Sequence, residues 1–253
     1  MARSAGSGQR LQLKLLGSFT LLSEAEQLRL PPSSQRVVAL LALRERPLSR
    51  VQVASTLWPD FPAERSLADL RTALWRARRA HALIVTAAGK CLCLASAIEV
   101  DVRELMSLGR PTALPPHGSA ASATKMSWAE LSLDLLPDWD DDWLIDDRER
   151  VRHLRLHALE ALTDQLSSCG RHAEAIQAAL AALRLEPLRE TAHAALIRAH
   201  LAQGNRSEAH RQYTRCREIL AAELTVEPSE SLQALLSVPH TRSRPVTRVG
   251  AGS

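Results

Sequence analysis

The sequence is poor in aromatic residues, which make up 3% of its 253 residues, and it holds only ten glycines. A protein built of β-sheets needs aromatic and β-branched side chains to fill them, so this scarcity argues against an all-β fold. Alanine and leucine supply most of the apolar content, and both are strong helix formers. We therefore predict a mainly α protein.

Long apolar runs are also absent. No stretch of 18 or more apolar residues occurs, and the first residues lack the apolar segment of a secretory signal peptide. The four cysteines form no CxxC pair: Cys91 and Cys93 alternate with leucines as on one face of a strand, and Cys169 and Cys216 lie in helical patterns. These features argue against membrane insertion, a disulfide framework and a zinc site, and they predict a cytoplasmic protein.

Lysine is rare, and charge is unevenly distributed. Only three of the 32 basic residues are lysine. Residues 1–97 hold 14 Lys and Arg against 6 Asp and Glu, a balance of +8, whereas residues 98–253 hold 18 against 22, a balance of −4. A basic first half favours a polyanionic partner, and the planar guanidinium of arginine can bond phosphate or guanine edges in a bidentate way.

Alternating apolar and polar residues predict short strands in the first half. The pattern places them at residues 11–15, 16–19 and 28–30. Residues 83–94 contain two further β-prone runs around Gly89, and this arrangement predicts a hairpin.

Three helices are predicted between the early strands and the hairpin. The first has Ser33 or Ser34 as its N-cap and ends before Pro47, the second follows Ser49, and the third covers residues 63–81. A basic third helix directly before a hairpin is the layout of a winged helix-turn-helix. In that fold the third helix enters the major groove and the hairpin contacts the DNA backbone.

The third helix carries the sharpest functional signal. Leu67, Leu70, Leu74 and Ala77 recur at helical spacing and predict its buried face. Another face starts with the small residue Ala68 and continues with arginines, which suits close docking into a groove and contact with guanine edges or phosphates. A solvated arginine-rich surface is the alternative interpretation. The candidate DNA-binding residues of this helix are Arg65, Arg71, Thr72, Arg76, Arg78 and Arg79.

Further phosphate contacts are predicted outside the third helix. The candidates are Arg36 and Arg44 on the first helix, Arg50 at the start of the second, and Thr86 and Lys90 on the hairpin. Each of these is a weaker signal, because an exposed basic residue is usually only solvated.

The second half is helical and repetitive. The six residues that begin at Gly170 recur 34 residues later at Gly204, a period typical of tetratricopeptide-type helical hairpins. Residues 128–136 and 143–155 are expected to supply helices that complete the stack, and the Pro-, Ser- and Ala-rich residues 109–125 are expected to form a loop.

No catalytic or metal-binding constellation is found. The acidic residues 138–147 lack the glycine and terminal glutamate of an EF-hand, and they predict a helix start with Trp139 and Trp143 packed inward. His153 and His157 lie four apart, but no glutamate follows the first as in HExxH. Phosphate-loop, dinucleotide and hydrolase motifs are also absent. We therefore predict no enzymatic activity, no cofactor and no metal.

Several motifs resemble the short form of the Streptomyces antibiotic regulatory protein type of transcriptional activator, over residues 11–236. In the first half the resemblance rests on Leu57-Trp58-Pro59 and on Leu74-Trp75-Arg76-Ala77-Arg78-Arg79. The second half resembles the bacterial transcriptional activator domain of that family in residues 136–143, 154–162, 187–190, 204–209 and 223–229.

The resemblance implies an OmpR-like winged helix that binds tandem promoter repeats and a helical domain that recruits RNA polymerase. The implied partners are duplex DNA, RNA polymerase holoenzyme and a second copy of the chain on DNA, and the implied targets are a specialised gene cluster such as one for secondary metabolism. The sequence departs from the family pattern at Ser23–Gln27, which replaces a glycine turn, at Ser34, which replaces a lysine, and at Leu92, which replaces an aromatic residue.

We expect two domains and one main function. Residues 11–97 would form the winged-helix domain and residues 98–238 the tetratricopeptide-like domain, with disordered segments at 1–10 and 239–253. The main hypothesis is a DNA-binding transcriptional activator. The alternative is a tetratricopeptide-type scaffold whose basic N-terminal module binds protein or RNA, and a third hypothesis is a metal hydrolase that uses the acidic segment.

Overall fold

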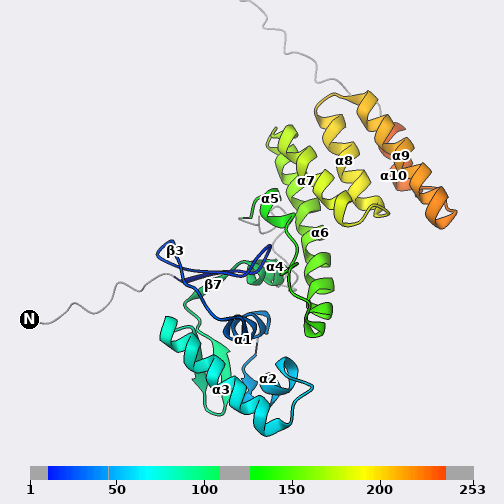
Figure 1. The fold of residues 1–253 in the computed structure, drawn as a ribbon. Coiled ribbons are helices and arrows are strands. Elements are labelled where there is room, and N and C mark those ends of the chain that lie inside the picture. Colours follow the sequence, from blue (N-terminus) through cyan, green and yellow to red (C-terminus); the bar gives the residue numbers. More distant parts are fainter. Residues whose placement is uncertain (1–10, 45, 109–125, 238–253) are drawn as a thin grey trace, which may run out of the picture.

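The computed structural model describes residues 11–44, 46–108 and 126–237. The segments expected to be disordered or to form a loop, at residues 1–10, 109–125 and 239–253, lie outside this range. The fold is mainly helical, as predicted: a winged helix forms the N-terminal half and a stack of helices the C-terminal half (Figure 1).

The N-terminal half opens with a four-stranded sheet in the order β3-β2-β1-β7. The central strand β1 pairs antiparallel with β2 and parallel with β7, and β2 pairs antiparallel with β3. These strands are β1 (Leu11–Lys14), β2 (Thr20–Ser23), β3 (Glu26–Gln27) and β7 (Ile98–Val100).

The predicted strand at residues 16–19 was wrong. Gly17 has a φ of +82° and turns the chain. Its amide donates a hydrogen bond to the Asp134 carbonyl at 2.7 Å, and Leu16 forms an isolated bridge with Leu135. This segment therefore joins the C-terminal half instead of extending the sheet.

The predicted strand at residues 28–30 was also wrong, because the chain reverses earlier. Glu24 and Ala25 both have positive φ values, of 50° and 71°, as in the two-residue turns that suit the twist of a hairpin. This turn sets Ser23 opposite Glu26, so the third strand begins at residue 26 and covers only Glu26 and Gln27.

Strand β7 was not predicted, and it extends the N-terminal sheet past residue 97, where we expected the first domain to end. Helix α4 (Asp101–Leu108) follows directly. The carboxylate of Asp101 accepts hydrogen bonds from the backbone amides of Leu15 at 2.9 Å and Leu16 at 2.9 Å. These bonds tie the start of α4 to the end of β1.

Three helices follow the early strands, as predicted: α1 (Pro32–Leu43), α2 (Arg50–Leu57) and α3 (Ala63–Ala80). Ser49 caps α2 in a reciprocal capping box with Gln52. The predicted serine cap of α1 was wrong, because Pro32 occupies the first helical position and Ser34 lies inside the helix. The buried Ser34 hydroxyl donates instead to the Ala73 carbonyl of α3 at 2.8 Å.

A three-stranded sheet in the order β4-β6-β5 completes the winged helix. Its strands are β4 (Leu48–Ser49), β5 (Val85–Ala88) and β6 (Cys91–Leu94). Leu92 and Leu94 are buried, whereas Cys91 and Cys93 share the more exposed face. The predicted hairpin and the alternation along its second strand are confirmed.

The C-terminal half consists of stacked helical pairs, as the 34-residue repeat predicts. Gly170 and Gly204 occupy the turns inside the two pairs, with φ values of +75° and +83°. The predicted helix at residues 128–136 shortens to α5, and a single 3-10 turn, η1, precedes α6. The elements are α5 (Trp128–Leu131), η1 (Asp142–Leu144), α6 (Ile145–Ser168), α7 (His172–Leu185), α8 (Glu190–Ala202), α9 (Arg206–Leu224) and α10 (Glu230–Ser237).

One hydrophobic core runs through both halves. Leu15 after β1, Leu40 of α1, Leu136 before η1 and Leu159 of α6 belong to the same buried cluster. Helix α6 extends from the helical stack to the N-terminal half, where it contacts α4 (Figure 1). A membrane-spanning helix is not found in the part of the chain that the structure describes.

Candidate nucleic-acid interface

Helix α3 is positioned by its buried side. It packs against α1 and α2, and the Ser66 hydroxyl donates to the Trp58 carbonyl at 3.1 Å, which fixes the start of the helix. Leu67, which we predicted on the buried face, is only half-buried, and the buried face begins with Ser66 instead. The buried residues are Ser66, Leu70, Ala73, Leu74 and Ala77.

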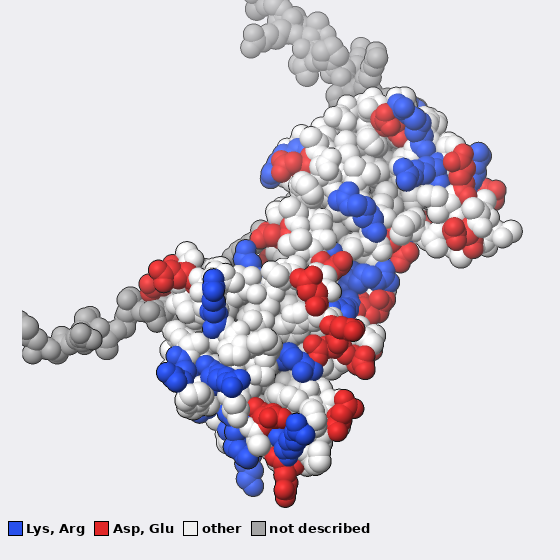
Figure 2. Space-filling view, viewed as in Figure 1, with Lys and Arg blue, Asp and Glu red and all other residues white. Residues whose placement is uncertain are grey.

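The opposite side of α3 presents an arginine surface to solvent. In the described ranges, none of its five arginines forms an ion pair with a carboxylate. Figure 2 shows lysine and arginine side chains gathered over the part of the molecule that α3 occupies in Figure 1. All six candidates of this helix are exposed and are brought together here: Arg65, Arg71, Thr72, Arg76, Arg78 and Arg79.

The sequence analysis missed an aromatic residue on this surface. The side chain of Trp75 is 57% exposed, and the guanidinium carbon of Arg79 lies 5.0 Å from its ring centroid. Phe61, in the turn before α3, is 40% exposed and is covered in the same way by Arg65 at 4.1 Å. The signal was present, since Trp75 lies one helical turn from Arg71 and from Arg79 and off the apolar stripe.

The hairpin β5–β6 lies beside α3, as a wing does. Helix α3 contacts β5, and Thr86 and Lys90 are both exposed. Lys90 follows Gly89, whose φ of +62° makes the tight turn between the strands. The hydroxyl of Thr86 lies 3.1 Å from the thiol of Cys93 on the neighbouring strand. Both predicted wing residues are therefore accessible.

Two arginines that we predicted to contact phosphate, Arg36 and Arg44, form ion pairs with carboxylates of the C-terminal half. The guanidinium of Arg36 pairs with the Asp141 carboxylate, and that of Arg44 pairs with Asp147 at 2.7 Å. Both arginines are thus bound to the acidic segment of the C-terminal half rather than grouped with α3. Arg50, the first residue of α2, is half-exposed and has no carboxylate partner within the described residues.

The acidic segment forms the junction between the two halves. Besides the two ion pairs, the ring of Trp139 stacks on Phe19 with 6.1 Å between centroids. The predicted inward packing of Trp139 and Trp143 is confirmed, since both are partly buried against the core. Within the described residues, no group of three His, Cys, Asp or Glu is arranged to hold a metal ion.

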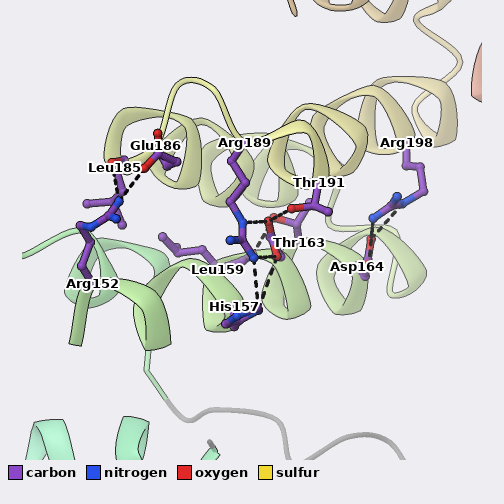
Figure 3. Close-up of polar contacts among 11 residues, drawn as sticks. Arg152, His157, Leu159, Thr163, Asp164, Leu185, Glu186, Arg189, Thr191 and Arg198 are labelled. Atoms are coloured by element: carbon purple, nitrogen blue, oxygen red, sulfur yellow. Dashed lines mark hydrogen bonds and ion pairs between the residues drawn. The ribbon is translucent and has the colours of Figure 1, made fainter. Parts of the chain in front are cut away.

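Two arginines of the helical half, unlike those of α3, are paired with carboxylates that lie one repeat away in the sequence. Arg152 of α6 donates to Glu186 at 2.8 Å, and Arg198 of α8 donates to Asp164 of α6 at 3.0 Å (Figure 3). Each of these pairs spans 34 residues, because the repeat sets equivalent positions of neighbouring helical pairs side by side.

Glu160 lies at the centre of the row of polar contacts that joins α6 to residues 185–198, which we call the seam. It accepts hydrogen bonds from Arg189 at 2.7 Å and from the Thr191 hydroxyl at 2.6 Å (Figure 3). Burial acts to raise the pKa of Glu160, but the bonds from Arg189 and Thr191 outweigh it and lower the pKa below its usual value. The carboxylate is thereby held ionised as a structural link.

A pocket of about 510 Å³ lies next to the seam, between α6, α8 and α10. Its wall combines carboxylates, a guanidinium and apolar side chains, so both charged and apolar groups face the pocket. The lining residues are His157, Glu160, Ala161, Asp164, Glu190, Thr191, Ala194, Arg198, Ser229, Ser231, Leu232 and Leu235.

Residues 117–237 match the family model of the bacterial transcriptional activator domain. The chain is also similar to the regulatory protein AfsR of Streptomyces coelicolor, with 29% identity over 89% of this chain and 24% of that protein. AfsR of Streptomyces griseus is 26% identical over 81% of this chain and 22% of its own length. The chain thus spans less than a quarter of these relatives.

Among solved structures, the fold is similar to Mycobacterium tuberculosis EmbR in complex with a low-affinity phosphopeptide. The TM-score is 0.66 at 22% identity, and the match covers 90% of this chain and 64% of that one. The winged helix and the helical stack therefore occur together in a known protein with the same fold.

Proposed function

We propose that this chain is a transcriptional regulator of the Streptomyces antibiotic regulatory protein type, which binds promoter DNA through its winged helix and activates transcription through its helical half. Activation would proceed by recruitment of RNA polymerase holoenzyme and would involve no catalysis by this chain. Such a protein would work in the bacterial cytoplasm, and its targets would be a specialised gene cluster such as one for secondary metabolism.

The observation that carries the proposal is the arginine surface of α3. The five guanidinium groups have no carboxylate partner among the described residues, and they outnumber Glu64 and Asp69 of the same helix, so α3 offers a net positive charge to a polyanion. The arginines of the seam are different, because Arg152, Arg189 and Arg198 are bound to acidic side chains. Charge is therefore concentrated where a winged helix would meet DNA.

We assign base contacts to the middle of α3 and phosphate contacts to its surroundings. Arg76 lies one helical turn after Thr72 on the exposed surface, as a residue that reaches guanine edges in the major groove would. Lys90 and Thr86 on the wing and Arg50 on α2 would contact phosphates, which fixes register without reading sequence. Arg36 is left out of this set because it is paired with Asp141.

The experiment is a binding titration with the full chain, since the core continues from the winged helix into α6. Affinity for duplex DNA should fall with salt, with a log–log slope of about −0.9 for each phosphate contacted. Arg76→Ala should reduce discrimination for the preferred site by about 1–3 kcal/mol, whereas Arg50→Ala should weaken all duplexes alike. Binding that does not depend on salt would contradict the proposal.

Activation is tested separately, in transcription with purified polymerase. Promoter repeats would seat two copies side by side, and the helical halves would present their pockets to polymerase or to each other. A variant with an altered pocket, Leu235→Asp, should bind DNA normally and lose activation. Full activation by this variant would place the polymerase contact elsewhere.

The alternative function is an interaction scaffold whose basic N-terminal module binds protein or RNA. The mixed pocket between α6, α8 and α10 favours it, because helical stacks hold partner segments on such surfaces. Genome-wide immunoprecipitation separates the two functions. Discrete promoter peaks support the regulator, and an expressed protein without peaks supports the scaffold.

A further inference from the structure

We propose that Trp75 is a specificity-determining residue that reads the 5-methyl groups of thymine in the major groove. The inference rests on the proposed function, because it requires α3 to enter DNA. It adds an apolar contact to an interface whose other candidate residues are polar or charged.

Trp75 occupies the centre of the exposed surface of α3. Arg71 lies one turn before it and Arg79 one turn after it, so the three side chains share one side of the helix. Ala68 lies two turns before Trp75, and its small side chain leaves room on that side. The 57% exposure of Trp75 therefore belongs to the part of the helix that would face the groove floor.

Arg79 holds the indole in place. Its guanidinium lies over the ring, 5.0 Å from the centroid, where the attraction between cation and ring favours a fixed arrangement. One face of the ring is thus covered, and its edge and other face remain available for contact. A ring held in this way loses little conformational freedom on binding.

Thymine is the partner that fits an apolar group on this surface. Base edges in the major groove present hydrogen-bond donors and acceptors, and the thymine methyl is the apolar group among them. The arginines on both sides of Trp75 complement a phosphate backbone, which argues against an apolar pocket of a protein as the occupant. The indole would cover one or two methyl groups while the arginines hold the strands.

The test uses the full chain and a duplex site selected by the wild-type protein from a random library. Each thymine of the selected site is then replaced by uracil, which lacks only the methyl group. We expect one or two positions at which uracil weakens wild-type binding by about fourfold for each methyl lost. In Trp75→Ala the same replacements should have no effect, and Trp75→Phe should keep part of the penalty.

Phe61→Ala is the matched control. Phe61 is also exposed and also carries an arginine over its ring, but it lies in the turn before α3. The uracil penalty should persist in this variant. Circular dichroism and thermal melting verify that Trp75→Ala is folded, and Trp75→Gln provides a second variant with a larger polar side chain.

Three results would overturn the inference, and they point to different causes. If the wild type selects no sequence, the proposed DNA readout fails and the inference fails with it. If a site is selected but uracil is neutral at every position, Trp75 does not read methyl groups, while the proposed function stands. If the uracil penalty persists in Trp75→Ala, another residue makes the contact.

Discussion

Burial changes the acid–base chemistry of His193 in α8. Its side chain is 2% exposed, and its ring nitrogens lie 2.8 Å from the Pro187 carbonyl oxygen and 2.6 Å from the side-chain amide nitrogen of Gln212. Burial lowers the pKa of this imidazole, as does the charge of Arg215, and the Pro187 carbonyl and Glu190 oppose the shift. The neutral ring is therefore favoured in the folded protein.

We expect stability to fall as the pH is lowered from 7 to 5.5. The unfolded chain takes up a proton at His193 near the usual pKa of about 6.5, and the folded chain takes it up only at lower pH. The free energy of unfolding is thus fully retained above that value and declines below it. Urea unfolding at several pH values measures the decline, which His193→Gln should reduce and the exposed-site control His210→Gln should leave unchanged.

A second buried titratable group is Cys216 of α9. It is fully buried, and burial raises the pKa of its thiol to about 11. Because the thiolate is the reactive species, we expect no alkylation of Cys216 by iodoacetamide at pH 8 in the native protein. The exposed Cys169 should react readily, and mass spectrometry distinguishes the two sites. Equal labelling of both would contradict the packing of α9.

At the scale of elements, the turns inside the helical pairs depend on backbone conformation more than on space. Gly204 has a φ of +83°, and no atom lies within 4 Å of the Cβ that a larger residue would add. The glycine is therefore required by its left-handed backbone and not by crowding. Gly170 holds the same place in the preceding pair, with a φ of +75°.

We expect Gly204→Val to destabilise the chain by about 1–3 kcal/mol, because a β-branched residue is strained in this conformation. Gly204→Asn should cost less, since asparagine tolerates the left-handed region better. Urea unfolding gives both values. The same order at Gly170 would confirm that the two turns are equivalent, and equal costs for valine and asparagine would show that φ is not the cause.

At the scale of the whole molecule, ion pairs and a shared hydrophobic core at the junction hold the two halves together. The Arg44–Asp147 pair has side-chain exposures of 31% and 7%, so its acidic partner is largely removed from water. The Arg36–Asp141 pair and the buried leucines around Leu136 lie at the same junction. A winged helix bound to DNA would therefore fix the direction of the helical stack.

We expect Asp147→Asn to lower the free energy of unfolding by about 1.5–3 kcal/mol, because Arg44 loses a charged hydrogen-bond partner. Asp141→Asn should act in the same direction through Arg36. Asp140→Asn and Asp142→Asn are controls, since the carboxylates of these exposed neighbours have no partner within the described residues. Equal stability of all four variants would show that the ion pairs do not hold the junction.

The sequence by itself determined the features whose signals are local. The capping box of Ser49 and Gln52, the apolar stripe of α3 and the hairpin at residues 83–94 each depend on spacings within one element. The 34-residue repeat is local in the same sense, because each helical pair repeats its own turn and its own buried face. The predicted arginine surface of α3 followed from the helical spacing of its apolar and basic residues.

Only the tertiary structure decided which distant groups meet. Arg36 and Arg44 bind carboxylates 105 and 103 residues away, and no spacing in the chain indicates those partners. Strand β7 is three residues long, and it forms because β1 offers a free edge beside it. Trp75 lies between these cases, because its place off the apolar stripe of α3 indicates exposure in the sequence, whereas the packing of α1 and α2 against the opposite side leaves it 57% exposed. Such choices depend on the burial and charge that folding creates, and these are not properties of any single segment.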